Sequence, residues 1–206
     1  MIKKEKLLIL APHTDDESLG CGGLIARTIE EGGEVSVLVF TTNYGVSTYD
    51  EFNKAMHVLN VSFLSKQYFT ALTFDQTAII EMISVIETTC RTFKPTTVAI
   101  PFQNSFHQDH EVIAKAAMSA LRPHGYIPQK VLAYEQPYYG IWDFGDAFKP
   151  NYYVDITNYL DKKLEALKCY KSQKIPFDMI KAMAQLRGGE SGTKYAEAYI
   201  LMREVI

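Results

Sequence analysis

The fold is predicted most directly by residues 6–40, which read KLLILAPHTDDESLGCGGLIARTIEEGGEVSVLVF. The apolar run from Lys6 to Ala11 stops at a proline, which is typical of a strand buried on both faces of a parallel sheet. A segment of helical length, Glu17 to Glu31, closes with the helix-stop signal Gly32-Gly33. A second apolar run follows from Val35 to Phe40. This stretch therefore predicts a β-α-β unit.

The alternation of strand and helix continues along the chain. Further helices are predicted at about 49–59, 77–93, 111–121 and 158–172, and further strands near 61–64, 96–100, 130–135 and 152–156. The stretch from Gln136 to Tyr153 is dense in Tyr, Pro and Gly and is predicted to be irregular. Because no linker, repeat or low-complexity segment interrupts the chain, residues 1–206 are predicted to form a single three-layer α/β domain with a mostly parallel central sheet.

Composition excludes several classes of protein. With 206 residues, 47% of them hydrophobic and 22% charged, the chain has the composition of a globular protein. A net charge of -3 provides no overall attraction to nucleic acid or anionic membranes, so neither is expected as a partner. No apolar run approaches the ~18 residues of a membrane span or forms a signal-peptide core, and we expect a cytoplasmic protein. The oligomeric state stays open, a homo-oligomer included.

The cysteines do not indicate a disulfide framework or a thiolate zinc site. Cys21, Cys90 and Cys169 are odd in number, lie far apart and lack C-x-x-C spacing. They are predicted to be reduced and mostly buried.

Polar side chains gather in two loops, each directly after a predicted buried strand. His13, Asp15 and Asp16 follow the first strand. His107 and His110 follow the strand near 96–100. Since ligands of open α/β sheets bind at the carboxyl ends of the strands, both loops are expected on one rim. Two histidines and a carboxylate with an open position suit a catalytic metal ion, beside which a second carboxylate can act as a base.

Some of these residues also fit other sites or purely structural roles. Either loop alone is also compatible with a polar helix N-terminus, whose carboxylates bond free amide hydrogens. Two such loops in a chain with five histidines favour the metal site. Gly20, Gly22 and Gly23 follow the acidic turn instead of forming it, so they indicate close helix packing and not a dinucleotide site. A two-His, one-carboxylate set also suits ferrous oxygenases, but their usual scaffold is all-β.

The motifs also resemble those of a known family. Residues 11–26, APHTDDESLGCGGLIA, resemble the PHxDDExxGxGGxxA signature of the LmbE-like, or PIG-L, metal-dependent de-N-acetylases. His107-Gln108-Asp109-His110 is similar to the HxDH motif of that family. The C-terminal residues Arg187-Gly188 and Tyr195-Ala196-Glu197-Ala198 are similar to its RG…G…YAEA segment. The resemblance runs nearly end to end and implies a Rossmann-like α/β fold.

The resemblance also implies roles for individual residues. His13, Asp16 and His110 would be ligands of zinc, or of ferrous iron as in some members. Asp15 would be the general base, and His107 would polarise the amide carbonyl. The remaining motif residue, Asp109, would orient His107 or one of the ligands.

The activity implied by the resemblance is removal of an acetyl group from an N-acetylglucosamine-type amino sugar linked to a nucleotide, a lipid or a small aglycone. Hydrolysis of another small N-acyl amide or thiol conjugate is one alternative, and a non-catalytic sugar-binding protein is another. Candidate substrate contacts are four aromatic residues that could stack on a sugar ring and one arginine that could bind a phosphate or carboxylate: Tyr44, Tyr138, Tyr139, Trp142 and Arg187. Packing of the aromatic loop and a Gly-capped helix end at Arg187 are the structural alternatives.

Overall fold

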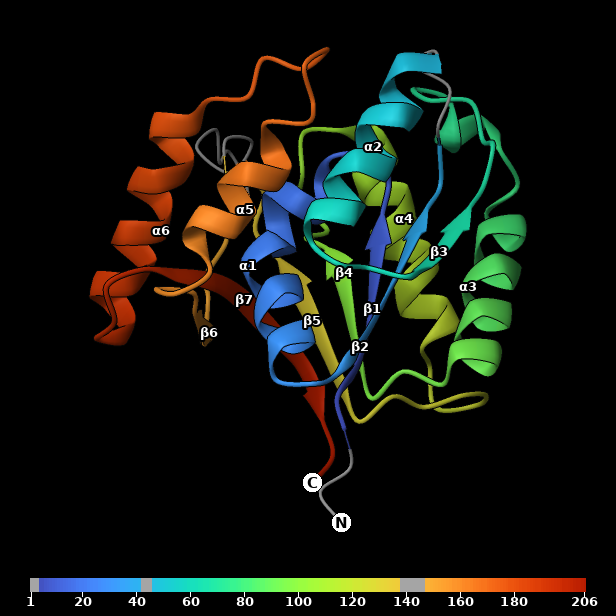
Figure 1. The fold of residues 1–206 in the computed structure, drawn as a ribbon. Helices are drawn as coiled ribbons and strands as arrows, with labels where there is room; N and C mark the ends of the chain where they lie inside the picture. Colours follow the sequence, from blue (N-terminus) through green and yellow to red (C-terminus); the bar gives the residue numbers. More distant parts are fainter. Residues whose placement is uncertain (1–3, 42–45, 138–146) are drawn as a thin grey trace.

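The computed structural model describes residues 4–41, 46–137 and 147–206, and all strands among them belong to one seven-stranded sheet (Figure 1). The strands are β1 (Lys6–Ala11), β2 (Glu34–Val39), β3 (Phe63–Lys66), β4 (Thr97–Pro101), β5 (Lys130–Tyr134), β6 (Tyr152–Asp155) and β7 (Ala196–Glu204). The helices are α1 (Asp16–Glu30), α2 (Val46–Val58), α3 (Ile79–Phe93), α4 (Gln108–Ala120), α5 (Leu160–Leu167) and α6 (Phe177–Ser191), with a short 3₁₀ turn, η1 (Phe74–Gln76).

The strand order is β3-β2-β1-β4-β5-β7-β6, and the first five of these strands are paired in parallel. The expected α/β fold with a mostly parallel sheet is confirmed. β7 is antiparallel to both β5 and β6, so the sheet is mixed at this edge. The register of β1 against β2 is continuous from Lys6↔Glu34 to Ala11↔Val39.

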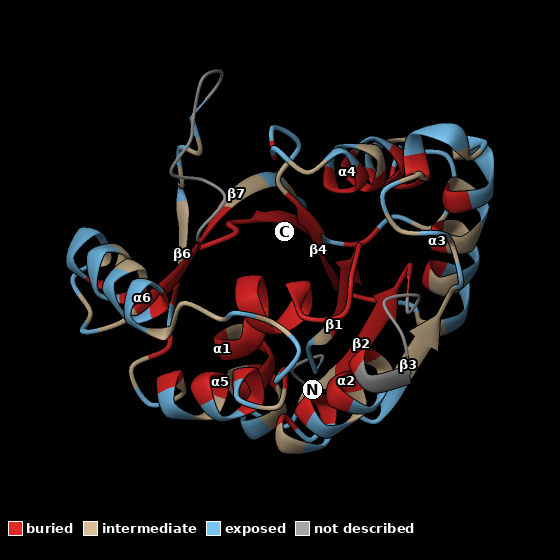
Figure 2. Ribbon diagram, turned by 90° about the horizontal axis from the view of Figure 1, so that it is seen from above, coloured by how far each residue is buried: buried red, intermediate tan, exposed pale blue. Residues whose placement is uncertain are grey.

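Helices cover both faces of the sheet, which gives three layers (Figure 2). Side chains of β1 alternate between the faces, as strand geometry requires. Leu7 and Ile9 belong to the core shared with α1, α2, α5 and α6, whereas Leu8 and Leu10 belong to the core shared with α3 and α4. All four side chains are fully buried, as the continuous apolar run predicted.

Glycines bring α1 close to its neighbours. A Cβ on Gly20 would lie 2.4 Å from the ring of Tyr134, and a Cβ on Gly23 would lie 2.4 Å from Cγ2 of Ile156. The predicted role of these glycines in close packing is therefore confirmed. Because α1 starts at Asp16, its position against the sheet also fixes the position of the loop before it.

A buried ion pair fixes α1 further. Lys163 of α5 lies 2.6 Å from Glu197 of β7 and donates to the carbonyl of Leu19 at 2.7 Å. The Glu197 carboxylate accepts the backbone N–H groups of Gly23 and Leu24, each at 2.8 Å. The C-terminal segment thus holds the helix that carries the N-terminal motif.

Some element boundaries differ from the prediction. The strand expected near 61–64 is β3, shifted toward the C-terminus, because Val61 closes the end of α2 by donating its N–H to Met56. The helix expected over 158–172 is limited to α5. Beyond it, Ser172 donates from both its amide and its hydroxyl to the Glu51 carboxylate instead of continuing the helix.

The part of the chain that the structure describes contains no helix that is both long enough and apolar enough to cross a membrane.

Candidate active site

The two motif loops meet at the point where the strand order reverses. β1 pairs with β2 on one side and with β4 on the other, so the connections from β1 and β4 lead to opposite faces of the sheet. His13 and Asp15 lie in the loop between β1 and α1, and His107 caps the N-terminus of α4 after β4. The crevice at such a switch point is the usual ligand site of open α/β sheets.

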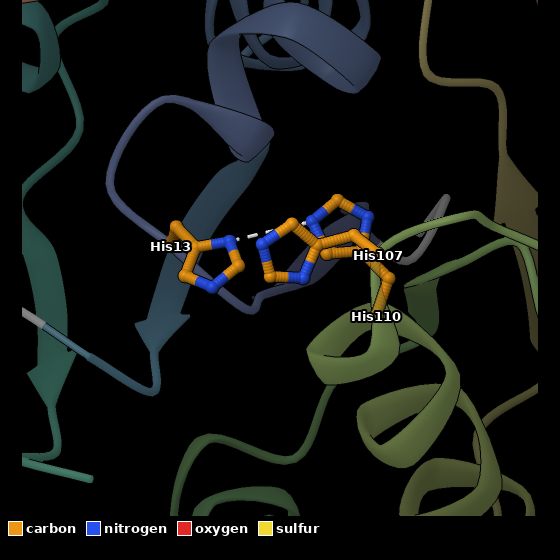
Figure 3. A group of neighbouring side chains, drawn as sticks. All are labelled: His13, His107 and His110. Atoms are coloured by element: carbon orange, nitrogen blue, oxygen red, sulfur yellow. Dashed lines mark hydrogen bonds between the residues drawn. The ribbon is translucent and has the colours of Figure 1, made fainter. Parts of the chain in front are cut away.

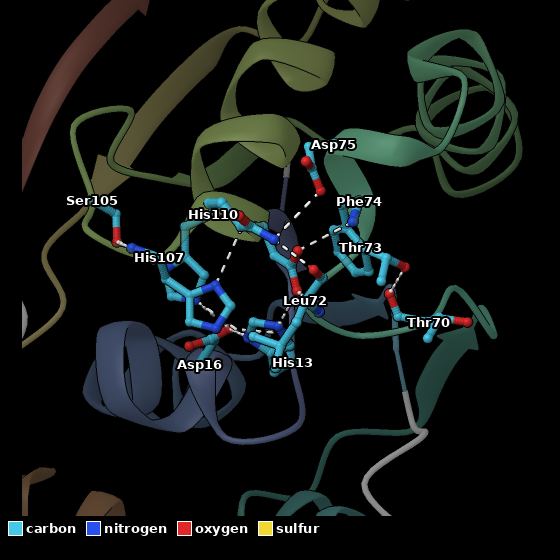
Figure 4. Close-up of polar contacts among 12 residues, drawn as sticks. His13, Asp16, Thr70, Leu72, Thr73, Phe74, Asp75, Ser105, His107 and His110 are labelled. Carbon is cyan, nitrogen blue, oxygen red and sulfur yellow. Dashed lines mark hydrogen bonds and ion pairs between the residues drawn. The ribbon is translucent and has the colours of Figure 1, made fainter.

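Three side-chain atoms converge at this switch point. His13 Nδ1, Asp16 Oδ2 and His110 Nε2 form a triangle whose edges are 3.3 Å from His13 to Asp16, 3.2 Å from Asp16 to His110 and 3.3 Å from His110 to His13 (Figure 4). All three residues are buried. The motif residues from the two loops therefore form one compact group, as the strand positions predicted.

The size of this triangle fits a tetrahedral metal ion. Ligand atoms about 2.0–2.1 Å from zinc are about 3.3 Å from one another at tetrahedral angles. His107 is a further candidate ligand, because one ring nitrogen from each of His13, His107 and His110 lies within 4.8 Å of the others (Figure 3). The tighter set that includes Asp16 matches the required spacing better, and it leaves His107 beside the metal position.

His13 is oriented by Asp109. Its Nε2 lies 2.9 Å from Asp109 Oδ2, so this nitrogen carries the proton of the neutral ring, the form in which Nδ1 has a lone pair for a metal. Asp109 is fixed in turn by the backbone N–H groups of Leu72 at 2.7 Å and Phe74 at 3.3 Å. Of the two roles expected for the Asp109 side chain, orientation of a candidate ligand is the one found.

The electrostatics of this group favour a cation. Burial lowers the pKa of His13, but hydrogen bonds to Asp109 and Asp16 and the charges of both carboxylates outweigh burial and raise that pKa to about 9. Burial raises the pKa of Asp16, but the facing rings of His110 and His13 hold it well below its usual range. Asp16 therefore stays a carboxylate, the form in which it can bind a metal ion.

Asp15 has an unusual backbone and an unusual carboxyl group. Its φ of 127° is rare for a residue with a side chain. Its N–H donates to Glu17 Oε2 at 3.1 Å, and its carbonyl accepts the N–H groups of Ser18 and Leu19. Burial, with the charges of Asp16 and Glu17, raises the pKa of Asp15 well above its ordinary value. A carboxyl group with a raised pKa beside the candidate ligands can hold and return a proton.

His107 has the properties of a neutral hydrogen-bond donor. Its Nδ1 accepts the N–H of Asp109 at 3.2 Å, so the proton of the neutral ring is on Nε2. Burial and the neighbouring rings of His13 and His110 lower the pKa of His107 to about 4. The centroid of its ring lies 4.5 Å from that of His13. His107 can therefore donate a hydrogen bond next to the metal position at neutral pH.

The predicted substrate contacts lie partly outside the described residues. Four of them are outside these residues: Tyr44, Tyr138, Tyr139 and Trp142. Arg187 lies in α6, where its guanidinium pairs with Glu135 and with Glu190, the latter at 2.9 Å. Residues 187–189 belong to this helix, which ends at a left-handed Gly192, so the structural alternative of a Gly-capped helix end is the one found.

Two residues of the site were missed by sequence reasoning. Gln136 donates from Nε2 to Asp16 Oδ1 at 2.8 Å, and Glu17 holds the backbone of Asp15. Glu17 also accepts hydrogen bonds from the hydroxyl groups of Ser18 and Tyr170. The position of Gln136 directly after a parallel strand was a usable signal, because that is the rim where the other site residues lie.

Comparisons with known proteins identify relatives of this chain. Residues 8–121 match the PIG-L family, described as GlcNAc-PI de-N-acetylase. The uncharacterized deacetylase YaiS of Escherichia coli K12 is 31% identical over 82% of this chain and 92% of its own length. The diacetylchitobiose deacetylase of Thermococcus kodakarensis is 27% identical over 94% of this chain and 81% of its own.

Among solved structures, the conserved protein TT1542 of Thermus thermophilus superimposes with a TM-score of 0.82 at 25% identity, covering 97% of this chain and 96% of that one. The likeness therefore extends over nearly the whole fold. The relatives named as deacetylases support an amide hydrolase.

Proposed function

This chain belongs to the PIG-L family, and we propose that it is a metal-dependent N-deacetylase that acts on an N-acetylglucosamine-type amino sugar. The observation that carries the proposal is the triangle of His13 Nδ1, Asp16 Oδ2 and His110 Nε2, with edges of 3.2–3.3 Å. A non-catalytic sugar-binding protein would need neither these three potential metal-ligand atoms nor a buried carboxyl group with a raised pKa next to them.

His13, Asp16 and His110 would hold the metal ion, zinc or ferrous iron. When bound, the ion would supply Lewis acidity, which lowers the pKa of a water molecule and polarises the acetamide carbonyl.

The other residues of the site move protons and stabilise charge. Asp15 accepts a proton from the attacking water. His107 donates a hydrogen bond from Nε2 to the oxygen that becomes negative as the carbonyl carbon turns tetrahedral. Asp15 then passes its proton to the nitrogen of the leaving amine, and the products are acetate and the free amino sugar. The raised pKa of Asp15 suits a group that must both accept and return this proton.

The substrate class is supported by the family and by the relative named a diacetylchitobiose deacetylase. We assign recognition of the rest of the substrate to side chains at the carboxyl ends of the strands, around the candidate metal site. Tyr44, Tyr138, Tyr139 and Trp142 are proposed to contact the sugar ring, since aromatic faces stack on such rings. A direct contact of Arg187 with an anionic group stays a proposal, and it requires the Arg187 guanidinium to share its hydrogen bonds with Glu135 and Glu190.

A screen for acetate release tests the proposal. Zinc-loaded and iron-loaded protein should be incubated with diacetylchitobiose and with free, nucleotide-linked and lipid-linked N-acetylhexosamines. We expect acetate and free amine in equal amounts from at least one amino sugar. The Asp15→Asn variant should release acetate about 10²- to 10⁴-fold more slowly than the wild-type protein. Release from N-acyl amino acids or thiol conjugates alone would contradict the proposed substrate class.

A further inference from the structure

Gln136 places a buried amide group beside Asp16. It lies two residues after β5, its exposed fraction is 5%, and its Nε2 is 2.8 Å from Asp16 Oδ1. An ionised carboxylate can only accept hydrogen bonds, so the nitrogen of the amide faces Asp16 and the oxygen is directed elsewhere. The chemistry of the contact thus fixes which way the amide is turned.

The amide oxygen of Gln136 has no hydrogen-bond partner. Among the residues described, it is the one buried side-chain oxygen without a donor. A buried acceptor that bonds to nothing is unfavourable, and such atoms are rare in folded proteins. A donor supplied by a bound molecule would satisfy this oxygen.

The chain around Gln136 is anchored, which makes the oxygen a fixed acceptor. Glu135 is paired with Arg187 through both carboxylate oxygens, one of them 2.9 Å from the guanidinium Nε. On the other side, Gln136 itself is held by Asp16. A group that is already ordered loses little entropy when a ligand binds to it.

We propose that Gln136 contacts the substrate. While Nε2 holds Asp16, Oε1 accepts a hydrogen bond from a donor near the scissile bond of the N-acetylated amino sugar. Two donors have this chemistry, namely the N–H of the acetamide and a hydroxyl on the ring carbon next to it. The inference rests on the proposed deacetylase function and adds a residue that selects the substrate.

The variant Gln136→Met tests the contact, because it keeps the length of the side chain and removes both polar atoms. Gln129→Met, at an exposed position, is the matched control. Zinc affinity, measured by competition with a chelator, should fall about 10-fold in Gln136→Met, since the partner of Asp16 is lost. At saturating zinc, kcat/KM for the N-acetyl sugar should fall about 10- to 100-fold, while Gln129→Met keeps wild-type values.

Substrate analogues separate the contact from the effect on Asp16. One analogue carries an acetate ester in place of the amide, and another lacks the hydroxyl next to the acetamido carbon. If Oε1 accepts a hydrogen bond from the substrate, Gln136→Met should lose much less kcat/KM with the analogue that lacks the donor. An equal loss with all three compounds would show that Gln136 acts through Asp16 alone, and the contact would be rejected.

A binding measurement gives a readout that does not depend on turnover. Calorimetry with the N-acetyl sugar should use zinc-saturated Asp15→Asn protein, which keeps the substrate intact, with and without Gln136→Met. Weaker binding by the double variant supports the contact, and equal binding contradicts it. Absence of acetate release by the wild-type protein would instead overturn the proposed function. The two failures are distinguishable, because the analogue series compares Gln136→Met with a wild-type protein that is active.

Discussion

Asp15, the proposed base, has a strained backbone. A residue with a side chain is held at a φ of 127° only when its surroundings compensate, here through Glu17, Ser18 and Leu19. Glu17 is fully buried and is itself held by Tyr170. These contacts give the third acidic residue of the motif a physical role, which is to hold the backbone that carries Asp15.

The first prediction separates metal binding from chemistry at Asp15. Asp15→Asn keeps the shape of the side chain but cannot accept a proton, so turnover should fall about 10²- to 10⁴-fold while zinc content stays at the wild-type level. Acetate release and metal content should be measured on the same preparation, with the exposed Asp178→Asn as control. Loss of zinc from Asp15→Asn would make Asp15 a ligand instead of a base.

The second prediction concerns His107. Its neutral ring donates from Nε2, so His107→Ala should lower kcat about 10²- to 10³-fold with little change in KM, because the bond strengthens only in the transition state. Zinc content should not change. His124→Ala, which removes an exposed histidine, controls for the general effect of such a substitution. A rise in KM at unchanged kcat would assign His107 to ground-state binding.

The sequence could predict which motif residues meet, but not how each is oriented. His13, Asp16 and His110 belong to recognisable spacings after buried strands, which is enough to bring them to one rim. The contact of Asp109 with His13 and that of Gln136 with Asp16 depend on side-chain rotamers and on loops far apart in the chain. Such contacts leave no periodic pattern in the sequence.

Helix α1 links the packing of the domain to the geometry of the site. Its glycine face allows Tyr134 and Ile156 to approach the backbone, and its first residue is Asp16. A displacement of α1 therefore moves Asp16 relative to His110. The glycines of the motif are explained by this close approach and not by the binding of a phosphate.

The third prediction tests this packing through Gly23→Ala. The added methyl would lie 2.4 Å from Ile156 Cγ2 and 2.9 Å from its Cβ. Overpacking of this kind should lower the free energy of unfolding by about 1–3 kcal/mol, measured by urea denaturation. Gly189→Ala is the matched control, because Gly189 also lies in a helix but has no atom near its added Cβ, and it should be neutral or slightly stabilising. Equal stability of the two variants would argue against the packing role.

Local patterns predicted the elements that alternate regularly and missed those that depend on distant partners. β1, β2, β4 and β5 are short apolar runs with clear stops, and their approximate bounds were predicted. The sequence patterns predicted no strand at β7 and indicated α6 only through the alternative of a Gly-capped helix end at Arg187. β7 enters the sheet between β5 and β6, and its antiparallel pairing joins residues far apart in sequence, which no local period encodes.

At the scale of the whole molecule, strand order decides where chemistry can occur. Because β1 and β4 are neighbours at the reversal of strand order, the loops that carry His13 and Asp109, 96 residues apart in the chain, meet at one rim of the sheet. Helices on both faces bury the strands that lead to this rim. Two predictions from the sequence remain predictions: a single domain over residues 1–206, and a cytoplasmic location.

We propose that His13, Asp16 and His110 hold one metal ion on which amide hydrolysis depends. The most direct test is to measure acetate release and bound metal together while a chelator removes the metal from purified protein. We predict one zinc or iron per chain, activity that falls in proportion to the metal removed and returns when one equivalent is added back, and a His110→Ala variant that neither retains the metal nor recovers. Full turnover by metal-free protein, or metal binding by His110→Ala with wild-type affinity, would contradict this account.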